Sequence, residues 1–227
     1  MDIPHPKNHP QDLSIETIDH VILDMDGTLL DLNFDDQVWN HRLPQRYAAL
    51  NNLSTLEATA KIKSLMSPIR GTLSWYCFDH WQTLVGIDLL TIENEVFDLV
   101  NTRDGAKPFL DRLKRLPCKV ILATNADRRS MTRKLSHTGL AEYFDAIFPS
   151  HDFGYAKEDI AFWQALQREI MFDSSRTLFI DDNHNVLTAA RQFGLEKLYG
   201  IQQPNSQGDV LSSEQFYCLR SFDEIGL

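Results

Sequence analysis

Cysteine is scarce in this sequence: Cys77, Cys118 and Cys218 are the only three in 227 residues. No two of them have the short spacing of a metal-binding pair, which argues against a cysteine-based metal site. Three scattered cysteines also make no disulfide framework. This usage is typical of a protein in the reducing cytoplasm.

Positive charge is in short supply as well. The chain has 22 Lys and Arg residues against 32 Asp and Glu, which gives a formal net charge of -10. Such a chain has no basic face large enough to hold a polymeric nucleic acid, so this class of partner is disfavoured. A small anionic substrate is still compatible, provided that the site supplies positive charge through a cationic side chain or a metal.

Long apolar runs are missing too. No run approaches the length that crosses a bilayer, so we expect no membrane partner. Residues 1–14 are rich in Pro, His and Asp and lack the apolar stretch of a signal peptide. We therefore expect a soluble cytoplasmic protein with a poorly ordered tail over residues 1–14. The sequence gives no indication of its oligomeric state.

Short apolar runs alternate with amphipathic segments through much of the chain. Strands are predicted at residues 20–23, 118–123, 145–148, 177–180 and 197–201, the last of the set. Helices are predicted at residues 109–116, 128–137, 158–171 and 186–193. This alternation predicts an α/β fold, a doubly wound parallel sheet of the Rossmann-like kind with helices on both faces.

Residues 35–103 have a different pattern. Apolar side chains recur there at three- and four-residue spacing without a convincing strand, which predicts a bundle of about four helices. Apolar residues make up 43% of the whole chain, enough for one core domain and a smaller insertion. We therefore expect a discontinuous core domain of residues 15–34 and 104–227, with residues 35–103 inserted as a helical cap.

Polar residues follow the predicted strands at the points where the strands end. These residues are Asp24 and Asp26 after the first strand, Thr124 and Asn125 after the second, Lys157 beyond the third, and Asp181 and Asp182 after the fourth. In an open parallel sheet, ligands bind beyond the carboxyl ends of the strands. All seven side chains are therefore predicted to meet at one edge of the sheet.

Each of these residues has an ordinary structural explanation when taken alone. Asp-x-Asp-Gly is a common turn, Thr-Asn and Asp-Asp commonly begin helices, and Lys157 could be a solvated lysine. Taken together, the carboxylates would repel one another unless a cation lay between them. Mg²⁺ prefers such oxygen ligands and binds phosphate at the same time. We therefore predict a magnesium site formed by Asp24, Asp182 and a backbone carbonyl.

The same residues are suited to phosphoryl transfer. The carboxylate of Asp24 can attack phosphorus without prior deprotonation. Asp26, two residues on, can protonate the leaving oxygen and later deprotonate the attacking water. Thr124 and Asn125 offer hydrogen-bond donors to phosphoryl oxygens, and Lys157 offers a compensating charge.

Four segments, in the same order, resemble the motifs of the haloacid dehalogenase (HAD) superfamily. They are Val21–Asp31 (VILDMDGTLLD), Ile121–Asn125 (ILATN), Gly154–Lys157 (GYAK) and Leu178–Asp182 (LFIDD). The resemblance implies that residues 35–103 are the C1 cap of this superfamily.

The resemblance also implies a role for each matching residue. Asp24 is the nucleophile and a metal ligand, and Asp26 is the acid and base and binds the metal through its carbonyl. Asp182 is the metal ligand of the fourth motif, while Asp181 lies just behind the metal or contacts Lys157. Thr124 and Lys157 bind phosphate. Val186 departs from members that carry a further acidic residue at that position, so water is expected to complete the metal shell.

Part of the predicted cap resembles bacterial nucleotidases of this superfamily that hydrolyse GMP and IMP. The similarity is clearest over residues 72–81 (TLSWYCFDHW) and 86–88. Trp75, Tyr76 and Trp81 are either a packed helix face or stacking partners for a purine. In the second case Asp79 or Arg70 would meet the polar edge of the base.

These observations lead to a Mg²⁺-dependent phosphomonoester hydrolase that forms an aspartyl-phosphate, with a purine 5′-nucleotidase as the leading hypothesis. The substrate partner is then a small phosphorylated metabolite, a purine nucleoside monophosphate. The alternatives are a phosphatase or phosphomutase for a sugar phosphate or other small metabolite, and a binding protein without turnover. Asp26 argues against a dehalogenase, which lacks this second Asp, and the complete set of catalytic residues argues against a binding protein.

Overall fold

A six-stranded parallel sheet forms the centre of the molecule, as seen in the computed structural model, which describes residue 13 and residues 17–226. Its strands are β1 (His20–Leu23), β2 (Lys119–Thr124), β3 (Ala146–Pro149), β4 (Thr177–Ile180), β5 (Lys197–Ile201) and β6 (Tyr217–Leu219). The order across the sheet is β3-β2-β1-β4-β5-β6, and every neighbouring pair is parallel. The predicted fold class is confirmed. The tail expected over residues 1–14 lies outside the described residues, apart from residue 13.

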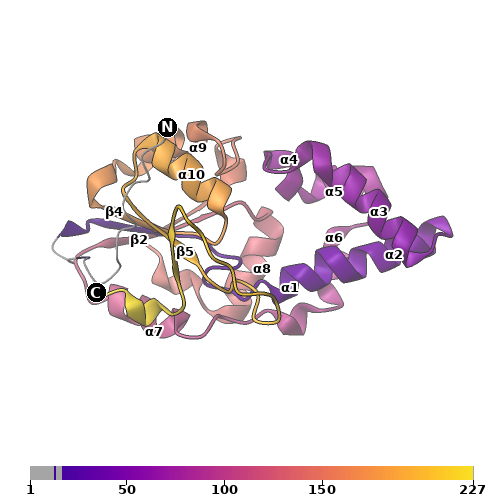
Figure 1. Cartoon of the computed structure of the whole chain (residues 1–227), viewed down its shortest axis with the longest axis horizontal. Coiled ribbons are helices and arrows are strands. Elements are labelled where there is room, and N and C mark those ends of the chain that lie inside the picture. The colour runs from indigo at the N-terminus through magenta and orange to yellow at the C-terminus, as the bar shows by residue number, and fades with distance from the viewer. Residues whose placement is uncertain (1–12, 14–16, 227) are drawn as a thin grey trace.

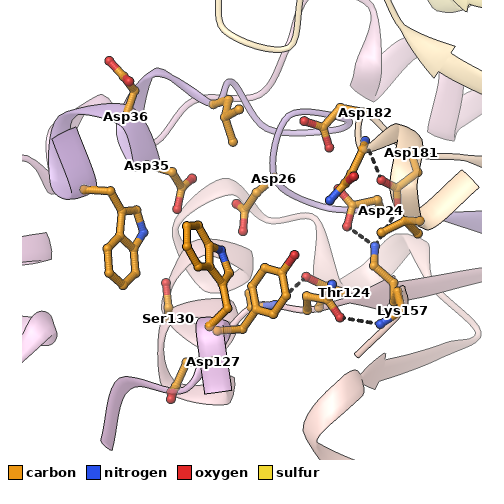
Figure 2. Close-up of a pocket in the computed structure, with 18 of the residues that line it drawn as sticks. Asp24, Asp26, Asp35, Asp36, Thr124, Asp127, Ser130, Lys157, Asp181 and Asp182 are labelled. Atoms are coloured by element: carbon orange, nitrogen blue, oxygen red, sulfur yellow. Dashed lines mark hydrogen bonds and ion pairs between the residues drawn. The ribbon is translucent and has the colours of Figure 1, made fainter. Parts of the chain in front are cut away.

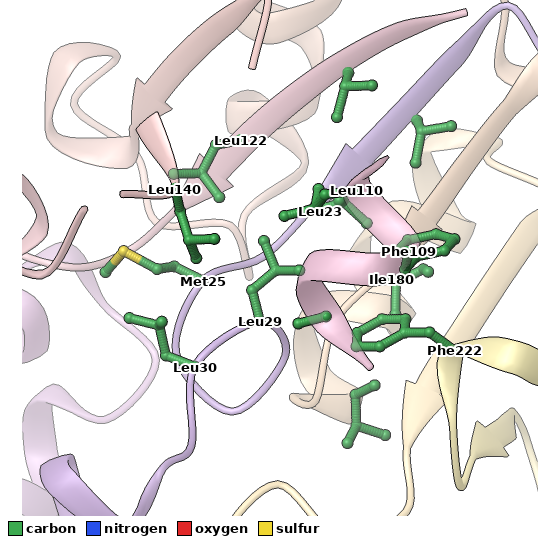
Figure 3. Close-up of a cluster of buried hydrophobic side chains, with 14 of the residues drawn as sticks. Leu23, Met25, Leu29, Leu30, Phe109, Leu110, Leu122, Leu140, Ile180 and Phe222 are labelled. Atoms are coloured by element: carbon green, nitrogen blue, oxygen red, sulfur yellow. The ribbon is translucent and has the colours of Figure 1, made fainter. Parts of the chain in front are cut away.

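Alternate residues of each central strand pack on opposite faces of the sheet, as the period of two requires. In β1, Val21 and Leu23 join a cluster with Phe109 of α7 on one face, while Ile22 joins a cluster with Trp163 of α9 on the other. The helices of the two faces are α7 (Ala106–Leu113) and α8 (Arg128–Thr138) on the first, and α9 (Ile160–Ile170) and α10 (His184–Phe193) on the second. Figure 3 shows the first cluster, in which the loop after β1 is anchored by buried Met25, Leu29 and Leu30.

Local hydrogen bonds explain where several helices begin. Asp159 accepts from the backbone N–H of Ala161, so α9 begins after it, at Ile160 rather than at residue 158. Asn183 caps α10 in the same way, and that helix begins at His184 rather than at residue 186.

The prediction that residues 197–201 form the last strand was wrong, because β6 adds to the edge of the sheet. With only three residues, β6 leaves too short a pattern to be seen in the sequence.

A helical segment separates β1 from the rest of the sheet. Its helices are α1 (Asn33–Asp36), η3 (Gln37–Arg42), α2 (Leu43–Asn51), α3 (Thr55–Met66), η4 (Ser67–Ile69), α4 (Leu73–Tyr76), α5 (Phe78–Val85), α6 (Leu89–Asn94) and η5 (Phe97–Leu99). They are shorter and more numerous than predicted. Figure 1 shows α1 to α6 projecting to one side of the sheet.

The sheet-forming part also contains short helical turns, namely η6 (Ala141–Tyr143), η7 (Ser150–Asp152), η8 (Ser174–Arg176) and η9 (Phe222–Glu224). In the described part of the chain, no helix is both long and apolar enough to cross a membrane.

Candidate active site

One cavity of about 460 Å³ lies where the carboxyl ends of the strands meet the helical segment. It is lined by all seven residues predicted from the strand ends, namely Asp24, Asp26, Thr124, Asn125, Lys157, Asp181 and Asp182. Figure 2 shows Asp24, Asp181 and Asp182 beside Lys157 at one end of the cavity, with Asp35 and Asp36 at the other and Asp26 between. The volume is typical of a pocket for a small molecule.

Lys157 is the buried cation at the end of the pocket. Its Nζ forms ion pairs with Asp24 and with Oδ2 of Asp181 (2.7 Å) and donates to the carbonyl of Ala123 at 3.0 Å. Its backbone N–H donates to Oδ1 of Asn125 at 2.9 Å, which fixes the loop after β3 against the end of β2. Burial alone would lower the pKa of Lys157, but Asp181 and Asp24 together outweigh burial and raise it. The lysine is therefore fully charged at neutral pH.

Three carboxylates close together form a candidate metal site. Asp24, Asp181 and Asp182 each offer an oxygen, and these oxygens lie within 4.8 Å of one another. Gly27 allows this crowding, since it has φ +81° and a Cβ there would lie 2.5 Å from Oδ2 of Asp182. An all-oxygen set of this kind fits a hard divalent cation such as Mg²⁺.

Excess negative charge at this site supports the same fit. Burial raises the pKa of Asp24 to about 7, although Lys157 opposes the rise. Burial and the neighbouring carboxylates of Asp181 and Asp24 raise the pKa of Asp182 well above its usual range. The single positive charge of Lys157 therefore cannot balance three ionised carboxylates. A divalent cation would favour their ionised forms and lower these pKa values again.

Asp26 lies apart from this cluster and contacts a residue that the sequence reasoning missed. Its Oδ1 pairs with Nζ of Lys134 at 2.9 Å, and Lys134 also pairs with Asp35 at 2.8 Å. A weak signal was present in the sequence. Lys134 falls on the buried face of α8, in step with Met131 and Leu135, where a lysine needs a charged partner.

Of the five cap residues predicted to set specificity, Arg70, Trp75 and Tyr76 line the cavity. Trp81 does not line it. It is completely buried, donates its Nε1–H to the carbonyl of Trp75 at 2.8 Å and packs against Trp39. In this structure Trp81 thus follows the packed-helix alternative and is closed to a stacking substrate. Trp39, which the sequence reasoning missed, lines the cavity instead.

Asp79 also lies outside the cavity lining. Its side chain is 76% exposed and pairs with Arg129 of α8 at 2.9 Å. The contact of Asp79 with the edge of a base stays a prediction, and in this structure the side chain is engaged by Arg129 instead.

Tyr76 connects the helical segment to the sheet-forming part. Its hydroxyl donates to Oε1 of Glu158 at 2.6 Å, and Oε2 of Glu158 accepts from Nδ2 of Asn125 at 2.9 Å. Burial and the neighbouring Glu158 raise the pKa of Tyr76, so the hydroxyl stays a donor. Glu158, next to Lys157, is a further residue that the sequence reasoning missed.

A parallel sheet with carboxylates and a buried lysine at its carboxyl edge defines a class of hydrolases, and comparison with known proteins identifies the family. The model of the haloacid dehalogenase-like hydrolases matches residues 18–194. The chain therefore belongs to the haloacid dehalogenase-like hydrolases, and within that superfamily it is a phosphatase.

Individual relatives agree with this family. Over 191 residues the chain is 38% identical to the GMP/IMP nucleotidase YrfG of Escherichia coli (strain K12), which covers 84% of this chain and 86% of that protein. An HAD phosphatase from Thermococcus onnurineus has a TM-score of 0.75 at 20% identity, covering 92% of this chain and 96% of that one. The L-2-haloacid dehalogenase from Xanthobacter autotrophicus has a TM-score of 0.55 at 17% identity, covering 87% and 80%. These two structures share the fold and say nothing about the substrate.

Proposed function

We propose that the protein is a Mg²⁺-dependent 5′-nucleotidase that hydrolyses purine nucleoside monophosphates, with GMP and IMP preferred. The observation that carries this proposal is the composition of the cavity described above. One end holds Asp24, Asp182 and Lys157 for a phosphate, and the helical segment adds Trp75 and Arg70 for a planar base. The similarity to the GMP/IMP nucleotidase of Escherichia coli over most of both chains supports the same substrate class.

In this proposal the reaction has two steps. A carboxylate oxygen of Asp24 attacks phosphorus, the bond from phosphorus to the leaving oxygen breaks, and Asp26 gives that oxygen a proton. Asp26 then takes a proton from water as the water oxygen attacks phosphorus, the bond from phosphorus to the Asp24 oxygen breaks, and inorganic phosphate and the free Asp24 carboxylate are released. Mg²⁺, held by the carboxylates of Asp24 and Asp182 and the carbonyl of Asp26, would offset the charge of the phosphoryl oxygens.

The remaining residues of the pocket orient the phosphoryl group. Lys157 already contacts Asp24, so its charge lies where the attacking and transferring groups meet. Thr124 is fully buried at the end of β2 and lines the cavity, and its hydroxyl oxygen accepts from the backbone N–H of Ala126 at 3.1 Å. Asn125 is held by Glu158 and by the backbone of Lys157, which keeps its amide in one orientation.

The helical segment is proposed to select the leaving group. Arg70 places its Cζ 5.4 Å from the centre of the Trp75 ring, and both residues line the cavity. A planar base can stack on such a ring and meet a guanidinium at its edge. We accordingly propose residues 35–103 as the cap, and residues 15–34 with 104–227 as the core domain.

The low cysteine content supports a cytoplasmic location for the activity.

The direct test is a substrate panel measured with Mg²⁺. We expect kcat/KM for GMP and IMP to exceed that for hexose phosphates, with p-nitrophenyl phosphate as the reference that uses no base recognition. Turnover of hexose phosphates in preference to every nucleoside monophosphate would overturn the nucleotidase assignment.

A cap variant tests the recognition itself. Trp75→Ala should lower kcat/KM for GMP by about 5-fold to 150-fold, since a stacking contact contributes about 1–3 kcal/mol, while p-nitrophenyl phosphate changes little. Leu84→Ala is the matched control, because Leu84 lies on α5 of the same segment, is 38% exposed and is outside the cavity lining. An unchanged ratio of GMP to hexose phosphate in Trp75→Ala would contradict base recognition by this residue.

A further inference from the structure

Lys134 is a buried charge that none of the steps above requires. Its side chain is 1% exposed, and its Nζ lies between two acids, 2.9 Å from Oδ1 of Asp26 and 2.8 and 3.0 Å from the two oxygens of Asp35. The ring of Phe34 lies 4.7 Å away and closes the site from a third side. Lys134 belongs to none of the four segments that resemble family motifs.

Stability is a weak explanation for such a residue. Burying an ammonium costs free energy, and a buried ion pair is often matched or exceeded by apolar side chains of similar volume. The other large side chains on the buried face of α8 are indeed apolar, namely Met131 and Leu135. A lysine at this position therefore calls for a role in what it contacts.

What Lys134 contacts is the side chain that moves the proton. Asp26 stands in the loop after β1, where its carboxylate has no other ion pair in the described part of the chain. A free aspartate would sample several staggered rotamers. The ammonium of Lys134 favours one of them, with the carboxylate turned toward Asp35 rather than toward Asp24, as Figure 2 shows. Asp35 belongs to α1, the first helix of the helical segment.

We propose that Lys134 is a positioning residue for Asp26. It holds the Asp26 carboxylate between the two ends of the cavity and connects it to α1 through Asp35. The inference rests on the proposed role of Asp26 as acid and base. Lys134 acts on the phosphoryl group only through Asp26. Its contribution is to fix where the proton donor stands when the leaving oxygen departs, which is a matter of orientation.

Leaving-group dependence tests this role. A ribose alkoxide needs a proton to leave, whereas p-nitrophenolate leaves without one, so a misplaced Asp26 harms the two substrates unequally. We expect Lys134→Met to lower kcat/KM for GMP at least tenfold more than kcat/KM for p-nitrophenyl phosphate. Lys134→Arg, which keeps the charge, should recover part of the loss. An equal loss on both substrates would overturn the proposal, because that is the result of a merely structural role.

Arg133→Met is the matched control. Arg133 is the neighbouring basic residue on α8, pairs with Glu93 of α6 at 3.1 Å and lines no part of the cavity. It removes a contact between α8 and the helical segment without touching Asp26, so the ratio of the two substrates should stay at the unmodified value.

Crystal structures provide a readout that needs no activity. The carboxylate of Asp26 should leave its present position in Lys134→Met and keep it in Arg133→Met, and an unmoved Asp26 would overturn the proposal. Should Lys134→Met not fold, Lys134→Gln gives the same comparison. If the protein hydrolyses no nucleoside monophosphate, the proposed function is wrong. The position of Asp26 in these crystals would still decide whether Lys134 positions it.

Discussion

Two acids at the end of the cavity proposed to bind phosphate, Asp24 and Asp182, can each either hold a proton or, in their ionised form, bind a metal. Asp24 and Asp182 are acids whose pKa values burial raises, and their neighbours carry more negative charge than Lys157 can balance. A cation that enters must displace the protons these acids hold. Metal binding, folding stability and pH are therefore linked through the same side chains.

The first prediction concerns this linkage. The pKa of Asp24 rises from about 3.9 in the unfolded chain to about 7 in the folded, metal-free protein. The folded state thus binds more protons than the unfolded state between these values, and stability should fall as pH rises through that window. Mg²⁺ binds the ionised form and restores what is lost. We expect the rise in Tm caused by Mg²⁺ to be larger at pH 8 than at pH 5.5.

Differential scanning calorimetry with and without Mg²⁺ provides the measurement. A concentration of about 100 times Kd stabilises a protein by about 2.7 kcal/mol, or about 5–10 °C for a chain of this size. Asp24→Asn is the control, since it removes one of the shifted acids and should weaken the pH dependence. A rise in Tm that is equal at both pH values would contradict the linkage.

The second prediction concerns the nucleophile. Asp24→Asn should lower kcat by about 10³-fold or more, since an amide cannot form the phosphoryl intermediate. The fold should persist, because Lys157 keeps its ion pair with Asp181 and one of three repelling charges is removed. Steady-state kinetics and circular dichroism check both parts. Substantial turnover by pure, folded Asp24→Asn would rule out the proposed role.

At the scale of helices and strands, the sequence pattern predicted those features that depend on neighbouring residues in the chain. The five longer strands and the residues that follow them could be found because a parallel sheet gathers its carboxyl ends at one edge. Lys134 and Glu158 could not, since their partners lie 108 and 82 positions away in the chain, at Asp26 and Tyr76. The burial of Trp81 likewise depends on how short helices pack, which periodicity alone does not decide.

Helix α4 contacts the sheet-forming part through the hydrogen bond from Tyr76 to Glu158 at 2.6 Å. The third prediction is that Tyr76→Phe and Glu158→Gln are coupled. Hydrogen bonds to charged groups contribute about 1.5–3 kcal/mol, so a double-mutant cycle of unfolding free energies should give a coupling in this range.

Tyr155→Phe is the control for that cycle. Tyr155 is 44% exposed and lies two residues before Lys157, so the loss of its hydroxyl should change stability by less than about 0.5 kcal/mol. Strict additivity of Tyr76→Phe and Glu158→Gln would mean that this hydrogen bond does not hold α4 in place.

In the molecule as a whole, most buried apolar side chains pack on the two faces of the sheet, and fewer pack within the helical segment. Two large clusters cover the faces of the sheet, and the first also takes in Phe34 and Val96 from the helical segment. A third, smaller cluster lies within that segment and is centred on buried Trp81, with Leu43 and Ile62. The base of the segment is thus packed onto the sheet, whereas its outer part depends on its own small core. Small cores are less stable, so local opening should begin there.

The last prediction tests this division. Trp81→Ala should lower the stability of the outer helices by about 3–5 kcal/mol. Hydrogen exchange should then quicken in α2, α3 and α5 while β1, β2 and β4 stay protected. Trp163→Ala, which empties a similar volume against the sheet, should instead quicken exchange in the strands. Equal loss of protection throughout Trp81→Ala would show one cooperative unit. Because Trp81 supports Trp39 and Trp75, two residues of the cavity lining, kcat/KM for GMP should also fall in Trp81→Ala, although Trp81 itself lies outside that lining.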